Sequence, residues 1–194
     1  GGLLEPYMFS TLGRKPKHFF LACGTASGPT DLNTFDRALR NAGIGDFNLV
    51  KLSSILPPKV TLSSQEEFKR SGPPNGDYLP IAFGSQVEYV AELRKDLTVI
   101  IFAAVAVGVP RDNRRSGLIM EYSGKTTFRT RTRDAPSEYS SPRARVKQMV
   151  RIGMADRGFA DSEYDIVAEQ ALYTTEKGDY ENAYGCAFAG VVLF

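Results

Sequence analysis

The amino-acid sequence predicts an α+β fold in which two packed β-sheets form the core and helices cover their outer faces. Most apolar segments are short and strand-like, whereas only two segments, one early and one late, have helical periodicity. The chain has 194 residues, of which 42% are hydrophobic, so it is long enough to bury a core without disulfides or a metal. No internal repeat or interior boundary interrupts this pattern, and we therefore expect residues 1–194 to form a single domain.

The first part of the chain is expected to form two strands with a helix between them. The strands are His18–Cys23 and Phe47–Leu52. Thr30 or Asp31 can cap the helix, and Gly43 ends it. The segment Thr61–Gly76 is polar and rich in Ser, Pro and Gly, which indicates a mobile loop.

The second part is expected to add six strands and a second helix. The strands are Tyr78–Phe83, Val87–Leu93, Leu97–Val107, Gly117–Tyr122, Glu163–Thr174 and Tyr184–Phe194. Ser140 or Ser141 can cap the helix, which has Pro142 in its first turn. Its apolar stripe comprises Val146, Met149, Val150, Gly153 and Met154. Arginine and threonine alternate over Arg129–Arg133, which predicts an exposed hairpin.

Composition and charge exclude several classes of protein. The formal net charge is +2, from 24 Lys and Arg against 22 Asp and Glu, which does not indicate a nucleic-acid partner. The longest apolar run, Thr98–Pro110, is too short to span a bilayer, and the first residues do not resemble a signal peptide. We therefore expect a cytoplasmic protein with no membrane partner.

The cysteines and the histidine limit the chemistry further. Cys23 and Cys186 lie in apolar strand-like segments, where reduced buried thiols are favoured over a disulfide. Because His18 is the only histidine, most zinc sites and histidine-based triads that need a second such partner are excluded, and we expect no metal. Its neighbours Phe19 and Phe20 favour a packing role for this ring.

The segment with the most distinctive chemistry is Ser53-Ser54, which closes a strand shortly before Pro57-Pro58. The prolines fix their own φ angles and push Leu56 out of the helical region, so the Ser-Ser peptide is expected to be held taut. A hydroxyl placed there can attack the preceding carbonyl and convert the amide into an ester. Elimination and hydrolysis would then leave a pyruvoyl group. The alternative from these residues alone is a strand-to-loop exit in which serine makes turn hydrogen bonds.

Four stretches of the chain together carry a more specific signal than any one motif. They are Leu32–Gly45 (LNTFDRALRNAGIG), Lys51–Pro58 (KLSSILPP), Gly117–Tyr122 (GLIMEY) and Gly185–Ala189 (GCAFA). In this order they resemble the pyruvoyl-dependent arginine decarboxylases, and Lys51–Pro58 is similar to that family's self-cleavage site. The resemblance spans His18 to the last residue and is weakest in Thr61–Gly76 and Lys125–Ser140.

The resemblance implies both an architecture and a reaction. The chain would cut itself between Ser53 and Ser54, giving a β chain of residues 1–53 and an α chain of residues 54–194 that begins with a pyruvoyl group. The fold would be a four-layer α-β-β-α sandwich of two mainly antiparallel sheets, assembled as a homotrimer of αβ pairs or a larger oligomer with active sites between subunits. The reaction would convert L-arginine to agmatine and CO2 through a Schiff base on the pyruvoyl group, without pyridoxal phosphate.

By the same resemblance, three residues besides Ser54 have catalytic roles. Glu121 would protonate the substrate's α-carbon after CO2 leaves, and its apolar neighbours are expected to raise its pKa. The strand pattern alone is equally compatible with an outward-facing Glu121. Asn48 would hydrogen-bond near the reactive carbonyl, and Ser53 would supply a new carboxylate after cleavage.

The substrate-binding residues also follow from the resemblance. Asp36 would receive the guanidinium group of arginine through a two-pronged hydrogen bond. Leu39 and Ile55 would line the aliphatic part of the pocket. Arg37 and Arg40 flank the same helix, and either of them, if it pointed into the pocket, would oppose a cationic substrate.

Two other functions are compatible with the sequence. In an N-terminal-nucleophile hydrolase, the chain would also be cut before Ser54, but this residue would keep its amine and hydroxyl. In a non-catalytic trimeric relative, the chain would stay uncut and serve as an assembly or binding module.

Overall fold

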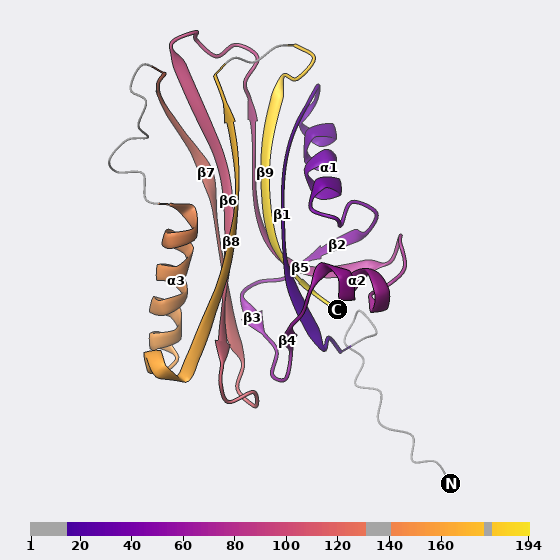
Figure 1. Cartoon of the computed structure of the whole chain (residues 1–194), viewed down its shortest axis with the longest axis vertical. Coiled ribbons are helices and arrows are strands. Elements are labelled where there is room, and N and C mark those ends of the chain that lie inside the picture. Colours follow the sequence, from indigo (N-terminus) through magenta and orange to yellow (C-terminus); the bar gives the residue numbers. More distant parts are fainter. Residues whose placement is uncertain (1–14, 131–140, 177–179) are drawn as a thin grey trace.

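Two β-sheets pack face to face in the computed structural model, which describes residues 15–130, 141–176 and 180–194 (Figure 1). The five-stranded sheet has the order β2-β5-β9-β1-β4, with β1 (His18–Gly28), β2 (Asn48–Lys51), β4 (Thr61–Leu62), β5 (Tyr78–Tyr89) and β9 (Tyr184–Leu193). The four-stranded sheet has the order β3-β7-β6-β8, with β3 (Ile55–Leu56), β6 (Leu97–Pro110), β7 (Gly117–Arg129) and β8 (Tyr164–Thr175). Two of the pairings, β1 with β4 and β2 with β5, are parallel, and the others are antiparallel.

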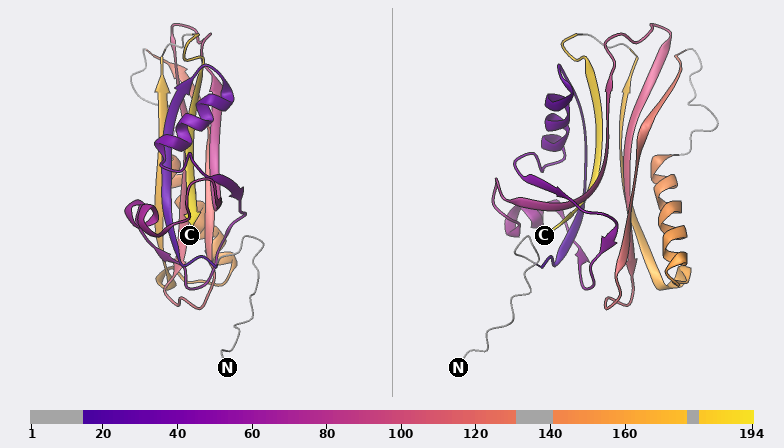
Figure 2. Two further views of the ribbon diagram at one scale, coloured as in Figure 1. Left: turned by 90° about the vertical axis from the view of Figure 1, so that its right-hand side faces the viewer. Right: turned by 180° about the vertical axis from the view of Figure 1, so that it is seen from behind.

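The helices lie on the outer faces of the two sheets, as the views in Figure 2 show. They are α1 (Asp31–Asn41), α2 (Gln65–Ser71) and α3 (Pro142–Asp156), with a 3₁₀ turn, η1 (Asp161–Glu163), after α3. α1 and α2 pack on the five-stranded sheet, and α3 packs on the four-stranded sheet. The predicted α+β sandwich with outer helices is therefore confirmed.

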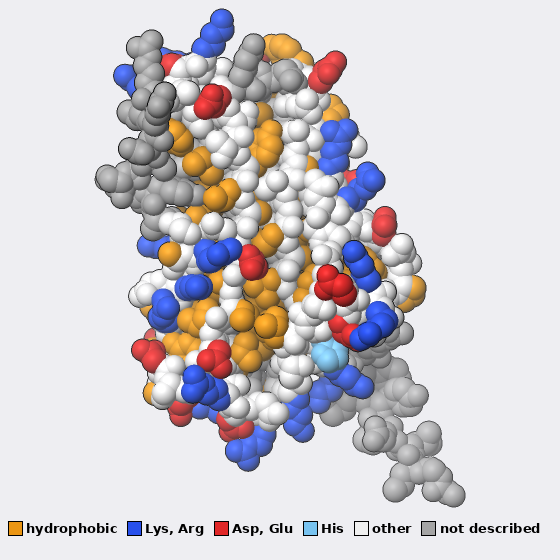
Figure 3. All heavy atoms as spheres, viewed as in Figure 1, with side chains coloured by type: hydrophobic (Ala, Val, Ile, Leu, Met, Phe, Trp, Pro, Cys, Tyr) orange, Lys and Arg blue, Asp and Glu red, His pale blue; other side chains and the backbone are white. Residues whose placement is uncertain are grey.

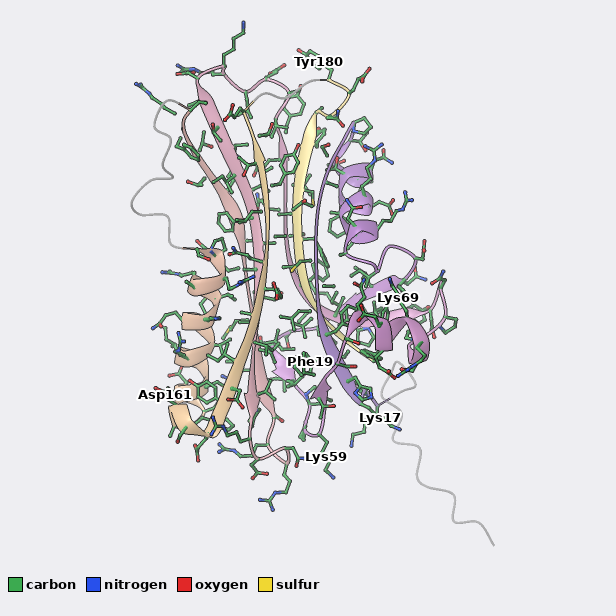
Figure 4. All side chains as sticks on the ribbon, viewed as in Figure 1. Lys17, Phe19, Lys59, Lys69, Asp161 and Tyr180 are labelled. Atoms are coloured by element: carbon green, nitrogen blue, oxygen red, sulfur yellow. The ribbon has the colours of Figure 1, made fainter. Side chains whose placement is uncertain are left out.

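The main core fills the space between the sheets, and the alternation of side chains along each strand explains its composition. On β6, Ile101, Ala103 and Val105 point toward the other sheet, whereas Ala104 and Ala106 point toward α3. All five are fully buried, which is why β6 reads as a continuous apolar run. Figure 4 shows the side chains of both sheets meeting in this layer, with Phe19 projecting into it from β1.

α1 approaches β1 closely because a glycine faces it. The Thr30 side chain caps the helix by accepting a hydrogen bond from the Asn33 amide. A Cβ on Gly24 would lie only 2.3 Å from the Ala38 carbonyl oxygen, so only glycine lets the helix backbone sit this near the strand. Gly43, with φ +82°, then ends the helix as predicted.

α3 also follows the expected pattern. Pro142 occupies its first turn, and Val146, Val150 and Met154 are buried against the four-stranded sheet. The Ser141 hydroxyl, however, donates to the Gln170 carboxamide of β8 and not to the helix backbone.

The prediction of a mobile loop over Thr61–Gly76 is wrong. Thr61 and Leu62 pair in parallel with the start of β1, and the α2 helix follows. Ser64 caps α2 by accepting from the Glu67 amide, and the Phe68 ring is buried against the sheet.

Two further strand assignments need correction. Tyr78–Phe83 and Val87–Leu93 are not separate strands, because β5 runs unbroken through Gly84 and stays paired with β9 from Ile81 to Tyr89. β7 extends beyond Tyr122 to Arg129. Residues 131–133 of the expected Arg129–Arg133 hairpin, and Ser140, lie outside the described residues.

The cysteines are free thiols, as the sequence favoured. The His18 ring lies 5.4 Å from the Phe194 ring and contacts the Thr61 hydroxyl at 3.3 Å, in line with a packing role. None of the helices in the described ranges is long and apolar enough to cross a membrane.

Candidate active site

The Ser53-Ser54 segment crosses from one sheet to the other. On its N-terminal side, the Leu52 amide donates to the Ile81 carbonyl of β5 at 2.8 Å. On its C-terminal side, the Ser54 carbonyl accepts from the Ile119 amide of β7 at 2.7 Å. The peptide bond between the serines is thus anchored in the five-stranded sheet at one end and in the four-stranded sheet at the other.

Glu121 lies two residues beyond Ile119 on β7 and faces the other sheet. Side chains two residues apart share a strand face, and Ile119 belongs to the core between the sheets. A Cβ on Gly84 of β5 would lie 3.5 Å from the Glu121 Cβ, which places this side chain against β5. The sequence pattern left an outward orientation open, and the structure excludes it.

The environment of Glu121 has opposing effects on its acidity. Partial burial raises the pKa of the Glu121 carboxyl, while the nearby Lys51 ammonium lowers it, and the raising effect is the larger. The Lys51 Nζ lies 3.4 Å from Glu121 Oε1 and 4.7 Å from the centre of the Phe83 ring. The predicted upward pKa shift therefore has the expected direction and cause, although the sequence did not indicate the lysine that limits it.

The β5–β7 edge of the sandwich becomes polar beyond Glu121. Ser123 and Lys125 follow on the same face of β7, and the Lys125 Nζ pairs with Glu88 of β5 at 2.7 Å. Gln86 Nε2 also donates to this Glu88 carboxylate at 2.6 Å. Along this edge, side chains beyond Glu121 are therefore polar, whereas the apolar core continues beside it on β6 through Ala103 and Ile101.

Asn48 is not next to the serine pair within the chain. It opens β2, and its side-chain amide donates to the Gly76 carbonyl at 2.8 Å. Ile55, by contrast, directly follows Ser54, and 45% of its surface is exposed. The roles of both residues stay predictions.

Asp36 is exposed on α1, and its neighbour Phe35 contacts β5. The Phe35 ring lies 6.4 Å from the ring of Phe83 on β5, and the Lys51 ammonium sits over the same Phe83 ring. Leu39 is only 8% exposed and packs beneath the helix, so little of its surface faces solvent. Their substrate-binding roles stay predictions.

The two arginines of α1 point elsewhere. Arg37 donates to the Ser27 carbonyl of β1, and Arg37 and Arg40 line an open hollow of about 650 Å³ with Tyr173 of β8. β1 faces β8 near one edge of the sandwich, and β5 faces β7 near the opposite edge. Neither arginine therefore faces Glu121 within the chain.

No role for Lys51 could be predicted from the sequence. It belongs to the KLSS motif, but a strand of only four residues has too little alternation to show which way its side chains point.

Comparison with known proteins places the chain among decarboxylases that carry a covalently bound pyruvoyl group. The family described as pyruvoyl-dependent arginine decarboxylase (PvlArgDC) matches residues 18–194, and the chain belongs to this family. It is accordingly a carboxy-lyase with a pyruvoyl cofactor in place of pyridoxal phosphate.

Relatives with the same name cover nearly the whole chain. A pyruvoyl-dependent arginine decarboxylase of Methanocaldococcus jannaschii is 33% identical over 179 residues, which are 92% of this chain and 90% of the relative. One of Methanococcus aeolicus is 34% identical over 181 residues, covering 93% and 92%. One of Thermococcus kodakarensis is 34% identical over 156 residues, covering 80% and 85%.

Proposed function

We propose that the chain cuts itself between Ser53 and Ser54 and that the product converts L-arginine to agmatine and CO2. The observation that carries this proposal is the serine pair itself, which bridges two sheets beside the half-buried Glu121. A pyruvoyl group derived from Ser54 fits this place, because a proton-donating carboxyl and the apolar core both lie next to it.

The cut begins with the Ser54 hydroxyl oxygen attacking the Ser53 carbonyl carbon. The amide C–N bond breaks as the ester C–O bond forms, and the hydroxyl proton passes to the amine. Loss of the Ser54 α-proton then expels the Ser53 carboxylate, and water finally replaces the nitrogen, which leaves as ammonia. Hydrogen bonds at Leu52 and Ser54 hold the two flanks of this peptide while it rearranges.

The pyruvoyl group supplies an electrophilic carbonyl that binds the substrate amine and accepts the electrons left by CO2. Glu121 donates the proton that replaces the lost carboxylate on the α-carbon. Its raised pKa favours the protonated form that this role requires. The new Ser53 carboxylate stays beside the site.

Asp36 binds the substrate guanidinium, and Leu39 and Ile55 contact its aliphatic chain. The exposure of Asp36 and Ile55 in one subunit supports a site that a neighbouring subunit completes. Asn48 belongs to the same proposal and orients the reactive carbonyl.

Assembly as a homotrimer of αβ pairs, or a multiple of it, accounts for the apolar surface. Large hydrophobic side chains such as Leu62, Tyr78 and Leu172 are 54%, 62% and 42% exposed. Figure 3 shows hydrophobic side chains along the middle of one face, between charged groups. Sedimentation equilibrium of the purified protein tests the trimer.

Intact-mass analysis tests the cut. We expect wild-type protein to give fragments 1–53 and 54–194, the larger one lighter by one ammonia than plain hydrolysis would leave it and reducible by borohydride. Ser54→Ala should stay whole, while the remote control Ser71→Ala on α2 should cut normally. Processed protein should release CO2 from arginine in preference to lysine or ornithine.

The two alternatives predict different masses. A larger fragment that keeps its amine would indicate an N-terminal-nucleophile hydrolase. Wild-type protein that stays whole after long incubation would indicate a non-catalytic relative. Either result would refute the proposal.

A further inference from the structure

We propose that Lys51 is a positioning residue for Glu121, which it holds beside the serine pair and whose charge it balances once the proton has been given up. The inference rests on the proposed role of Glu121 as proton donor. Lys51 belongs to the segment before the proposed cut, whereas Glu121 belongs to the segment after it.

The geometry connects the two residues directly. Lys51 is the last residue of β2 and stands two positions before Ser53, while Glu121 lies on β7 of the opposite sheet. The Lys51 Nζ is 3.4 Å from Glu121 Oε1 and sits over the Phe83 ring at 4.7 Å. The ring face restricts where the ammonium can move, since a cation is attracted to it.

The reaction explains why a cation is needed there. Each turnover consumes one proton, which Glu121 transfers to the substrate carbon, and the carboxyl becomes a carboxylate until solvent reprotonates it. A half-buried carboxylate is poorly solvated, so a fixed ammonium lowers the free energy of the state formed by proton transfer. Without Lys51, Glu121 would be a weaker acid.

The other charged groups near Glu121 do not replace Lys51. On β7 the next charge on this face is Lys125, and on β5 it is Glu88, and these two pair with each other at 2.7 Å. The adjacent position on β6 is Val105, and β5 presents Gly84. Among the described residues, Lys51 is therefore the cation whose charge acts on Glu121.

The first test measures the coupling without requiring cleavage or catalysis. In the uncut Ser54→Ala background, ¹³C-detected titration of the Glu121 carboxyl, assigned by Glu121→Gln, should give a midpoint about one pH unit higher when Lys51→Met is added. Lys51→Arg should restore the original midpoint. Lys125→Met, which removes the lysine of the neighbouring pair, should leave it unchanged. An unchanged midpoint in Lys51→Met would overturn the inference even if the enzyme works as proposed.

The second test measures the consequence for turnover, counted per processed chain. Lys51→Met should lower kcat about tenfold and move the alkaline limb of the kcat–pH profile upward, while KM for arginine changes little. Lys51→Arg should recover most of both effects, and Lys125→Met should match wild type. A lower kcat with an unmoved limb, or the same shift in Lys125→Met, would show that Lys51 has only a structural role. If Lys51→Met is not processed, the titration in the uncut background decides alone.

Discussion

Gly24→Ala is a perturbation whose magnitude follows from the contact between β1 and α1. The new Cβ would lie 2.3 Å from the Ala38 carbonyl oxygen and 2.8 Å from the Ala42 amide nitrogen. Both neighbours are backbone atoms, so no side-chain rotation relieves the clash. Restoring an ordinary contact requires α1 to move outward by about 1 Å.

The energetic cost can be bounded. Overpacking of this kind costs about 1–3 kcal/mol, and the lower entropy of unfolded alanine returns about 0.4–1 kcal/mol. We expect a net loss of about 1–2 kcal/mol in the free energy of unfolding, seen as a urea midpoint lower by about 0.5–1 M at fixed protein concentration. Gly84→Ala is the matched control for stability, since its Cβ would meet its nearest neighbours at 3.5 and 3.6 Å, which are ordinary contacts.

The same variant tests the proposed role of α1 in substrate binding. A shifted helix displaces Asp36, so KM for arginine should rise about tenfold, whereas cleavage at the serine pair should proceed normally. A Gly24→Ala protein as stable as Gly84→Ala would refute the packing argument. Reduced stability with an unchanged KM would remove Asp36 from the substrate site.

Three other predictions concern acidity, packing and thiol reactivity. Burial raises the pKa of Glu121 in the folded chain, so ionisation of this carboxyl opposes folding above its ordinary pKa of 4.5 and has no such effect below it. The free energy of unfolding of Glu121→Gln relative to wild type, measured by urea titration, should therefore increase from pH 4 to pH 7. A constant difference would contradict the raised pKa. Phe68→Ala removes a ring buried among those of Phe20, Phe47 and Phe194, and should lower the free energy of unfolding by about 3–5 kcal/mol. A loss below about 1 kcal/mol would mean that α2 unfolds separately. Burial raises the pKa of Cys23 and Cys186 to about 12, so both thiols of the native protein should react slowly with Ellman's reagent at pH 8. They should react quickly once the chain is unfolded, and rapid reaction of the native protein would disprove their burial.

Elements with a repeated apolar pattern could be predicted from the sequence, and those held by a single contact could not. The apolar stripe of α3 indicates that one face of this helix is buried, and the continuous apolar run of β6 indicates that both faces of this strand are buried. α2 has one buried apolar side chain, Phe68, so its composition suggests a loop. The available signal was Ser64 with Glu67 three residues later, a spacing typical of a helix start.

Gly84 misled the assignment of β5 for a related reason. Glycine and the polar residues after it suggest a break, but hydrogen bonding to β9 continues through this region. The polar residues Gln86 and Glu88 are tolerated because they face the polar end of the edge shared with β7.

The site was predictable only in part, because sequence distance does not tell which sheet a residue joins. The motifs pointed to Ser53, Ser54 and Glu121, which the structure brings together across two sheets. They did not point to Lys51, whose significance depends on a contact with a residue 70 positions later in the chain.

If the chain is cut as proposed, the position of β1 implies that folding precedes the cut. This strand belongs to the segment before the serine pair, yet it lies between β9 and β4 and is paired with β9 from Phe19 to Gly28. Residues 54–194 made alone would leave β9 with an unsatisfied edge, which promotes aggregation. Separately expressed halves should therefore recover a native-like particle only when refolded as a mixture, and the proposed cut would have to follow folding of the whole polypeptide.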